Sequence, residues 1–107
     1  MIDWDAVRDE VTQHLQELIR IDTTNPPGNE TAAARYIEGV LSREGLSPVF
    51  VESEPGRGNV LSTLAGGEGE PLMLLGHTDV VAAEPEHWTH PPFSGALIDG
   101  YVWGRGA

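Results

Sequence analysis

The sequence has 107 residues, 39% of them hydrophobic, as expected for a soluble globular domain of modest size. Asp and Glu number 17 against 6 basic residues, and the net charge of −11 excludes nucleic acid as a partner and disfavours an anionic membrane surface. Because the chain has no cysteine, disulfides and thiolate metal sites are excluded.

The predicted location of the protein rests on two features that the sequence lacks, a secretory signal and a membrane-spanning segment. The first residues lack the basic and apolar regions of a secretory signal, and no apolar stretch reaches the length of a membrane span. The acidic residues are scattered along the chain, which is typical of solvated helix faces. We therefore expect a cytoplasmic protein with no membrane contact.

Two amphipathic helices are predicted in the first half of the chain. From about Asp3 to Arg20, apolar residues recur every three or four positions, and Asp3 can cap the helix start. Turn formers and two prolines at 22–29 end this helix. The second helix is expected over 30–44, with Gly45 as its left-handed stop. This helix is expected to bury Ala33, Ala34, Ile37, Val40 and Leu41.

Three extended segments are predicted next. Residues 48–53 and 59–64 are expected to be strands joined by a glycine-containing turn. The run Leu72–Leu75 is short, apolar and bounded by proline and glycine, which is typical of a strand buried on both faces. Helices followed by strands indicate an α/β or α+β class.

A hairpin is predicted at 96–103. An Asp-Gly pair separates two apolar triplets, and this dipeptide is a strong signal for a two-residue turn. The expected register pairs Leu97 with Val102 on one face and Ile98 with Tyr101 on the other.

His77 and Asp79 are the leading candidates for chemistry. They follow the predicted strand at 72–75, and ligand sites in open α/β sheets lie beyond the carboxyl ends of strands. Residues two apart in extended chain point the same way, so the carboxylate can fix the tautomer of the ring and leave its other nitrogen for a metal. The pair could equally serve as a general base with its orienting group, or His77 could be a structural residue.

The other histidines and the large aromatic residues have simpler interpretations. His87 and His90 are expected to be partly exposed loop residues, and His14 is expected to be structural. Trp88 and Phe93 are candidates for a pocket wall, although packing explains them as well. A catalytic zinc ion takes about three protein ligands. Only His77 occupies a position typical of a ligand, so these residues alone do not complete a catalytic metal site.

Three segments in this order resemble a known family and together cover nearly the whole chain. They are NPPGNE at 25–30, GHTDVV at 76–81 with Trp88 and PPFSG at 91–95, and DGYVWGRGA at 99–107. This combination is similar to the co-catalytic zinc metallopeptidase and amidohydrolase family. The family includes acetylornithine deacetylase, succinyl-diaminopimelate desuccinylase, aminoacylase and carboxypeptidases of the G and S types.

The resemblance implies a fold and an activity. Residues 1–107 would form the N-terminal portion of a zinc-peptidase-like catalytic domain. This portion belongs to an α/β/α sandwich with a mixed, largely parallel central sheet, without the smaller lid or dimerisation domain. The parent would be a hydrolase of peptide or N-acyl amide bonds with two zinc ions, for which cobalt can substitute. Its substrates would be N-acyl amino acids or short peptides. The parent could be a homodimer.

The resemblance also implies roles for individual residues. His77 would ligate one zinc ion, and Asp79 would be the catalytic residue that orients His77. The zinc ions would activate water and polarise the scissile carbonyl, with a carboxylate base taking the proton. The bridging aspartate of the family follows the GRGA motif, and its paired glutamates, further acidic ligand and distal histidine come later still. We therefore expect the 107 residues by themselves to be inactive.

Two other interpretations remain open. The chain could be a non-enzymatic remnant or interaction module that keeps the front of the fold, or a hydrolase that uses His77 and Asp79 with a nucleophile. The latter is weakened because no serine stands in a nucleophile-elbow context. For any of them, the strand at 72–75 is expected to present an unpaired edge and apolar surface, which predicts marginal stability or self-association.

Overall fold

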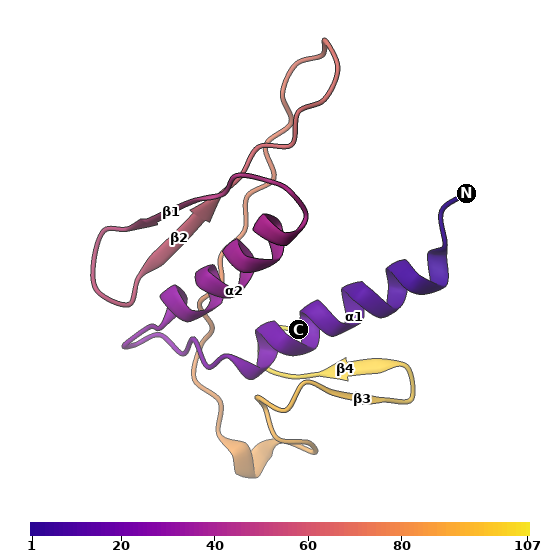
Figure 1. Ribbon diagram of the computed structural model, residues 1–107. Helices are drawn as coiled ribbons and strands as arrows, with labels where there is room; N and C mark the ends of the chain where they lie inside the picture. The colour runs from indigo at the N-terminus through magenta and orange to yellow at the C-terminus, as the bar shows by residue number, and fades with distance from the viewer.

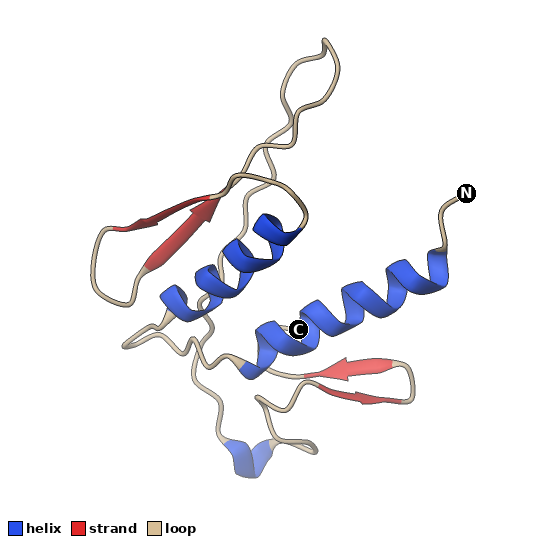
Figure 2. Ribbon diagram, viewed as in Figure 1, coloured by secondary structure: helices blue, strands red, loops and turns tan.

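Each long helix lies beside a β-hairpin in the computed structural model, which describes residues 1–107 (Figure 1). Helix α1 (Trp4–Arg20) lies beside the hairpin of β3 (Ala96–Ile98) and β4 (Tyr101–Trp103). Helix α2 (Glu30–Arg43) packs on the hairpin of β1 (Val49–Glu52) and β2 (Gly58–Leu61). A single 3₁₀ turn, η1 (Pro85–His87), interrupts the long loop between the hairpins (Figure 2).

Helix α1 begins as the sequence predicts. The Asp3 side chain accepts hydrogen bonds from the backbone amides of Asp5 and Ala6, each at 3.1 Å. The apolar stripe is only partly covered, however. Ile19 is buried near the end of the helix, whereas Trp4 and Val11 are 70% and 61% exposed. The second half of α1 therefore contributes most of its packing.

Helix α2 ends at Arg43, one residue before the predicted boundary, and Gly45 takes the expected left-handed conformation with φ of 80°. Ala33 and Ala34 are buried as predicted. Ile37, Val40 and Leu41 are only partly buried, so the prediction that they would be buried holds in part. The thin β1–β2 hairpin covers only part of the apolar face of α2, which accounts for the difference.

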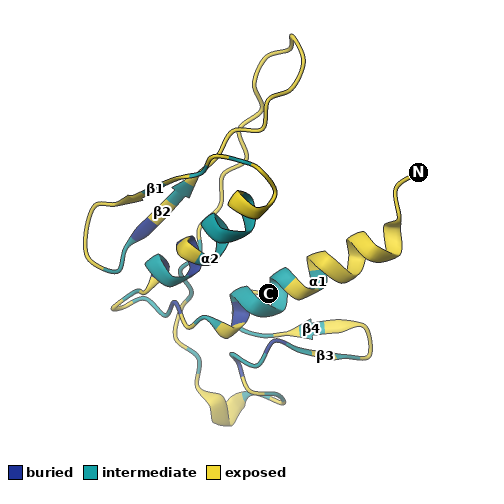
Figure 3. Cartoon of the chain, viewed as in Figure 1, coloured by how far each residue is buried: buried dark blue, intermediate teal, exposed yellow.

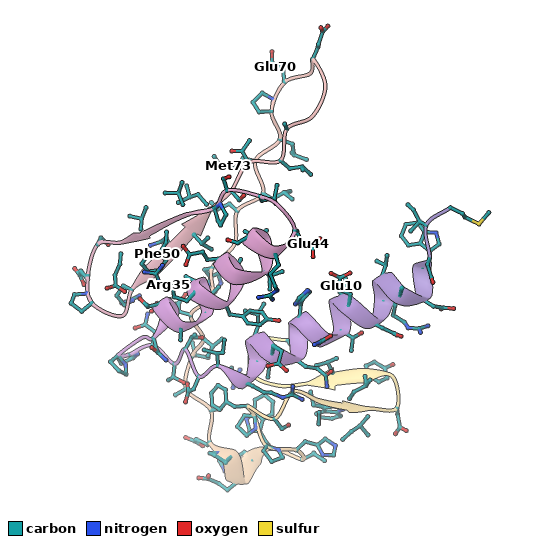
Figure 4. All side chains as sticks on the ribbon, viewed as in Figure 1. Glu10, Arg35, Glu44, Phe50, Glu70 and Met73 are labelled. Atoms are coloured by element: carbon teal, nitrogen blue, oxygen red, sulfur yellow. The ribbon has the colours of Figure 1, made fainter.

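The β1–β2 hairpin is antiparallel and pairs Phe50 with Val60. Strand β2 ends at Leu61, earlier than the predicted end at Leu64. Gly58 packs closely on α2 and β1, because a Cβ atom there would lie 2.7 Å from the Phe50 ring and 2.8 Å from the Thr31 hydroxyl. The Arg35 guanidinium lies 3.4 Å from the centroid of the Phe50 ring (Figure 4). Glycine at 58 and the cation–π contact together bring the hairpin close to α2.

The second hairpin confirms its prediction in detail. Leu97 pairs with Val102 and Ile98 with Tyr101. The turn residues Asp99 and Gly100 both have positive φ, at 51° and 82°, as an Asp-Gly hairpin turn requires.

The predicted strand at 72–75 does not form. No segment pairs with it, and its four side chains are 82–92% exposed. A strand of this kind depends on hydrogen-bonded neighbours and on covered faces. Neither is supplied here, because β1 and β2 pair only with each other. The run instead belongs to a loop that projects from the molecule, and it is exposed throughout (Figures 1 and 3). The predicted exposure of apolar surface at this position is confirmed.

The sheets are both two-stranded and antiparallel, and the one parallel pairing is an isolated bridge between Thr24 and Val80. Two helices with small sheets are compatible with an α/β class, while the α/β/α sandwich with its largely parallel sheet stays a prediction. The apolar core is small and consists of Ile19, Ala33 and Ala34. None of the helices combines the length and the apolar character that crossing a bilayer demands.

Candidate functional site

His77 and Asp79 form the contact that their spacing predicts. Nδ1 of His77 lies 2.8 Å from Oδ1 of Asp79 and 3.1 Å from the Asp79 carbonyl oxygen. The His77 side chain is 84% exposed, whereas the Asp79 side chain is 33% exposed. Nε2 of His77 has no hydrogen-bond partner. An ionised Asp79 can only accept, so the geometry favours a proton on Nδ1 and a lone pair on Nε2.

The second oxygen of Asp79 has its own partner. Nδ2 of Asn25 donates a hydrogen bond to Oδ2 at 3.0 Å. This hydrogen bond, followed by the one from His77, lowers the pKa of Asp79 below its usual value. Asp79 is therefore ionised at neutral pH, with both oxygens accepting hydrogen bonds.

The backbone around Asn25 holds this arrangement. The Asn25 amide donates to the Val80 carbonyl at 2.8 Å, and the Val80 amide donates to the Thr23 carbonyl at 3.2 Å. The buried hydroxyl of Thr23 donates to the Thr78 carbonyl at 2.6 Å. Residues 23–25 thus form a short parallel clasp on 78–80. Sequence reasoning placed Asn25 in a turn and in the family pattern, and nothing in the local pattern signals a partner 54 positions away.

A cleft of about 650 Å³ opens beside the pair. One wall comes from residues 76–79, and the other comes from α2 and the β1–β2 hairpin. Glu30 and Arg57 form an ion pair on that second wall, with 2.7 Å between Oε1 and Nη2. Glu30 is 7% exposed, and its Oε2 atom has no hydrogen-bond partner. Ten of its 13 lining residues are polar, charged or glycine.

The candidate pocket-wall residues lie elsewhere in the chain. Neither Trp88 nor Phe93 lines this cleft. Both are half-buried, and the Arg105 guanidinium lies 5.0 Å from the centroid of the Trp88 ring. The proposal that they wall a substrate pocket therefore stays a prediction.

The other histidines occupy separate environments. His14 Nδ1 lies 2.7 Å from the Tyr36 hydroxyl and links α1 to α2. His87 is exposed and pairs with Glu84 at 2.8 Å, and the His90 ring packs edge-on against Trp103 at 4.7 Å between centroids. The contact of His14 with Tyr36 agrees with its structural interpretation, and His87 and His90 lie in the region predicted as loop.

Comparison with known proteins supports the family resemblance. No family model matches the chain. It is 45% identical over 98 residues to a succinyl-diaminopimelate desuccinylase of Methylorubrum extorquens, and 43% identical to that of a Methylobacterium species. It is also 37% identical over 98 residues to aminoacylase-1 of Sus scrofa. The alignments cover 86–87% of the chain. Over most of its length the chain is therefore homologous to these hydrolases.

The match spans a limited part of the relatives. The chain covers 24% of the length of each of these family members. The family resemblance drawn from the three sequence segments is thus confirmed. The activity of the whole protein is not shown by a match of this extent.

The donor set can be tested against the zinc that the family implies. Within residues 1–107, no three His, Asp or Glu side chains lie close enough together to hold a metal ion. A catalytic zinc takes about three protein ligands. The exposed Nε2 of His77, with Nδ1 fixed by a carboxylate, fits one ligand and its orienting partner. The remaining ligands of such a site are not among these residues.

Proposed function

We propose that this chain is the N-terminal portion of a zinc-dependent hydrolase that cleaves N-acyl amide or peptide bonds. The observation that carries the proposal is the His77–Asp79 contact in a chain homologous to a desuccinylase and an aminoacylase. His77 binds zinc through Nε2, and Asp79 fixes the ring from Nδ1. In the whole protein the site holds two ions, and cobalt can replace zinc.

The substrate class follows from the relatives. Succinyl-diaminopimelate desuccinylase and aminoacylase-1 both bear names of enzymes that remove an acyl group from an amino acid. We therefore propose an N-acyl amino acid or a short peptide as the substrate. A cytoplasmic location and a homodimeric parent belong to the same proposal.

The 107 residues alone are proposed to be inactive. One imidazole ligand cannot hold a catalytic zinc ion in competition with water. The His77 ring is also 84% exposed, so no surrounding residues add to its hold on a metal ion.

The alternative is a non-enzymatic remnant or interaction module that keeps the front of the fold. The coding sequence after Ala107 discriminates between the two. An aspartate within a few codons and paired glutamates further on favour the hydrolase, whereas an in-frame stop favours the remnant.

Hydrolysis assays test the proposal. The 107-residue chain and the protein expressed from the extended reading frame are each loaded with zinc or cobalt and given N-succinyl-diaminopimelate, N-acetyl amino acids and dipeptides. We expect turnover from the extended protein only, and its loss in His77→Ala. His87→Ala is the matched control, because it removes another exposed histidine paired with a carboxylate at 2.8 Å. Activity that survives His77→Ala, or turnover by the 107-residue chain above its own His77→Ala variant, would contradict the proposal.

A further inference from the structure

We propose that Asn25 is a positioning residue, whose side-chain amide holds the Asp79 carboxylate in the orientation that fixes His77. This inference rests on the proposed metal role of His77 and adds a residue to that site. Its basis is the hydrogen bond of 3.0 Å from Nδ2 of Asn25 to Oδ2 of Asp79, opposite the contact of 2.8 Å from Oδ1 to His77.

The His77–Asp79 contact needs such support. His77 is 84% exposed, and exposed pairs of this kind contribute little stability because water competes for both groups. A carboxylate held only by its backbone can rotate about χ1 and χ2 and leave the ring. A donor on the second oxygen restricts both rotations, so Asp79 presents Oδ1 to the ring more of the time.

The anchor is itself fixed. Asn25 is tied to residue 80 through its backbone amide, and the return hydrogen bond from Val80 to Thr23 closes the clasp. Thr23 is buried, and its hydroxyl holds the carbonyl of Thr78, which lies between His77 and Asp79. Side-chain and backbone hydrogen bonds from residues 23–25 therefore fall on residues 78–80.

The pair of His87 and Glu84 offers a contrast to the pair of His77 and Asp79. His87 and Glu84 form a second pair with the same distance of 2.8 Å, and they lie on an exposed loop with 72% and 70% of their side chains exposed. The His87 backbone amide donates to the Glu84 carbonyl, and no side-chain amide donates to the Glu84 carboxylate. The two pairs differ in this brace and also in geometry, because only the His77–Asp79 contact is also a hydrogen bond, so His87 serves as an unbraced reference for His77.

The test is the tautomer of His77, read from imidazole ¹⁵N chemical shifts without metal, at a pH where the ring is neutral. We expect the Nδ1–H form to dominate at His77 and to be less populated at His87. In Asn25→Ala the ratio of Nδ1–H to Nε2–H at His77 should fall about threefold to tenfold, the range expected for one net hydrogen bond. Asn29→Ala is the matched control in the same loop, because Nδ2 of Asn29 faces the Asp22 carbonyl and not Asp79.

A reciprocal measurement covers the case in which Asn25→Ala disturbs the clasp. In Asp79→Ala, Asn25 is intact, and its side-chain amide resonances should shift more than those of Asn29 and Asn59. Unchanged His77 tautomers in Asn25→Ala with the backbone amide shifts of residues 23–25 preserved, or an unmoved Asn25 amide in Asp79→Ala, would overturn the proposal. Neither readout involves metal. If the protein failed to bind zinc, the proposed function would be refuted, but the test of Asn25 as a positioning residue would still stand.

Discussion

The amide of Asn25 and the carboxylate of Asp79, 54 residues apart, are joined by a hydrogen bond of 3.0 Å. Through it, the turn after α1 reaches the segment that carries His77. The site is thus assembled by a clasp between two loops, without the strand that the sequence predicts before it.

A packing prediction concerns Gly104, beside the small core. A Cβ at this position would overlap the Cγ2 methyl of buried Ile19 and lie 3.2 Å from the Pro92 carbonyl oxygen. We expect Gly104→Ala to reduce the free energy of unfolding by about 1–3 kcal/mol, as overpacking does. Gly66→Ala is the control, because nothing lies within 4 Å of its Cβ. Thermal unfolding followed by circular dichroism measures the stability of both variants. Equal melting temperatures for Gly104→Ala and Gly66→Ala would refute this account of the core.

The exposed run at 72–75 predicts self-association. Its apolar side chains are largely in water, and Leu74 is 88% exposed (Figure 4 shows the neighbouring Met73 on the projecting loop). Leu74→Lys should lower the apparent mass at high concentration without lowering stability. Val11→Lys makes the same chemical change at another exposed apolar residue, on α1, and should have a smaller effect. Sedimentation velocity over a range of concentrations checks this, and a wild-type chain that stays monomeric throughout would rule it out.

An alkaline transition is expected at the contact between the helices. Burial raises the pKa of Tyr36, and the neighbouring charge of Glu17 adds to this effect. The folded state therefore binds the phenol proton more tightly than the unfolded state, whose tyrosine has a pKa of about 10. This stability is present below pH of about 10 and is lost as pH rises through the folded pKa. Tyrosinate absorbance and circular dichroism measured together follow the transition.

Tyr36→Phe separates this effect from general alkaline unfolding. The variant lacks both the phenol proton and the hydrogen bond to His14 Nδ1. It should lose less stability than the wild type as the pH rises through the tyrosine pKa of about 10. The same alkaline loss in both proteins would show that Tyr36 is not responsible.

Local signals account for the parts of the fold that sequence predicts well. The Asp3 cap, the Gly45 stop and the Asp-Gly turn each depend on residues within a few positions, and all three are present. The strand at 72–75 depends on partners outside its own segment, and its apolar pattern alone cannot supply them. The His77–Asp79 contact is predictable because two residues set it, whereas Asn25 depends on a tertiary contact across 54 positions.

The most direct test of the central claim is the identity of the metal-bound nitrogen. The protein expressed from the extended reading frame is labelled with ¹⁵N-histidine, and its zinc is replaced by ¹¹³Cd. We predict a scalar coupling between ¹¹³Cd and Nε2 of His77, with Nδ1 protonated toward Asp79, and no coupling to His87. Cadmium coupled to Nδ1 of His77, or bound with no coupling to His77 at all, would contradict the assignment of this residue as a metal ligand.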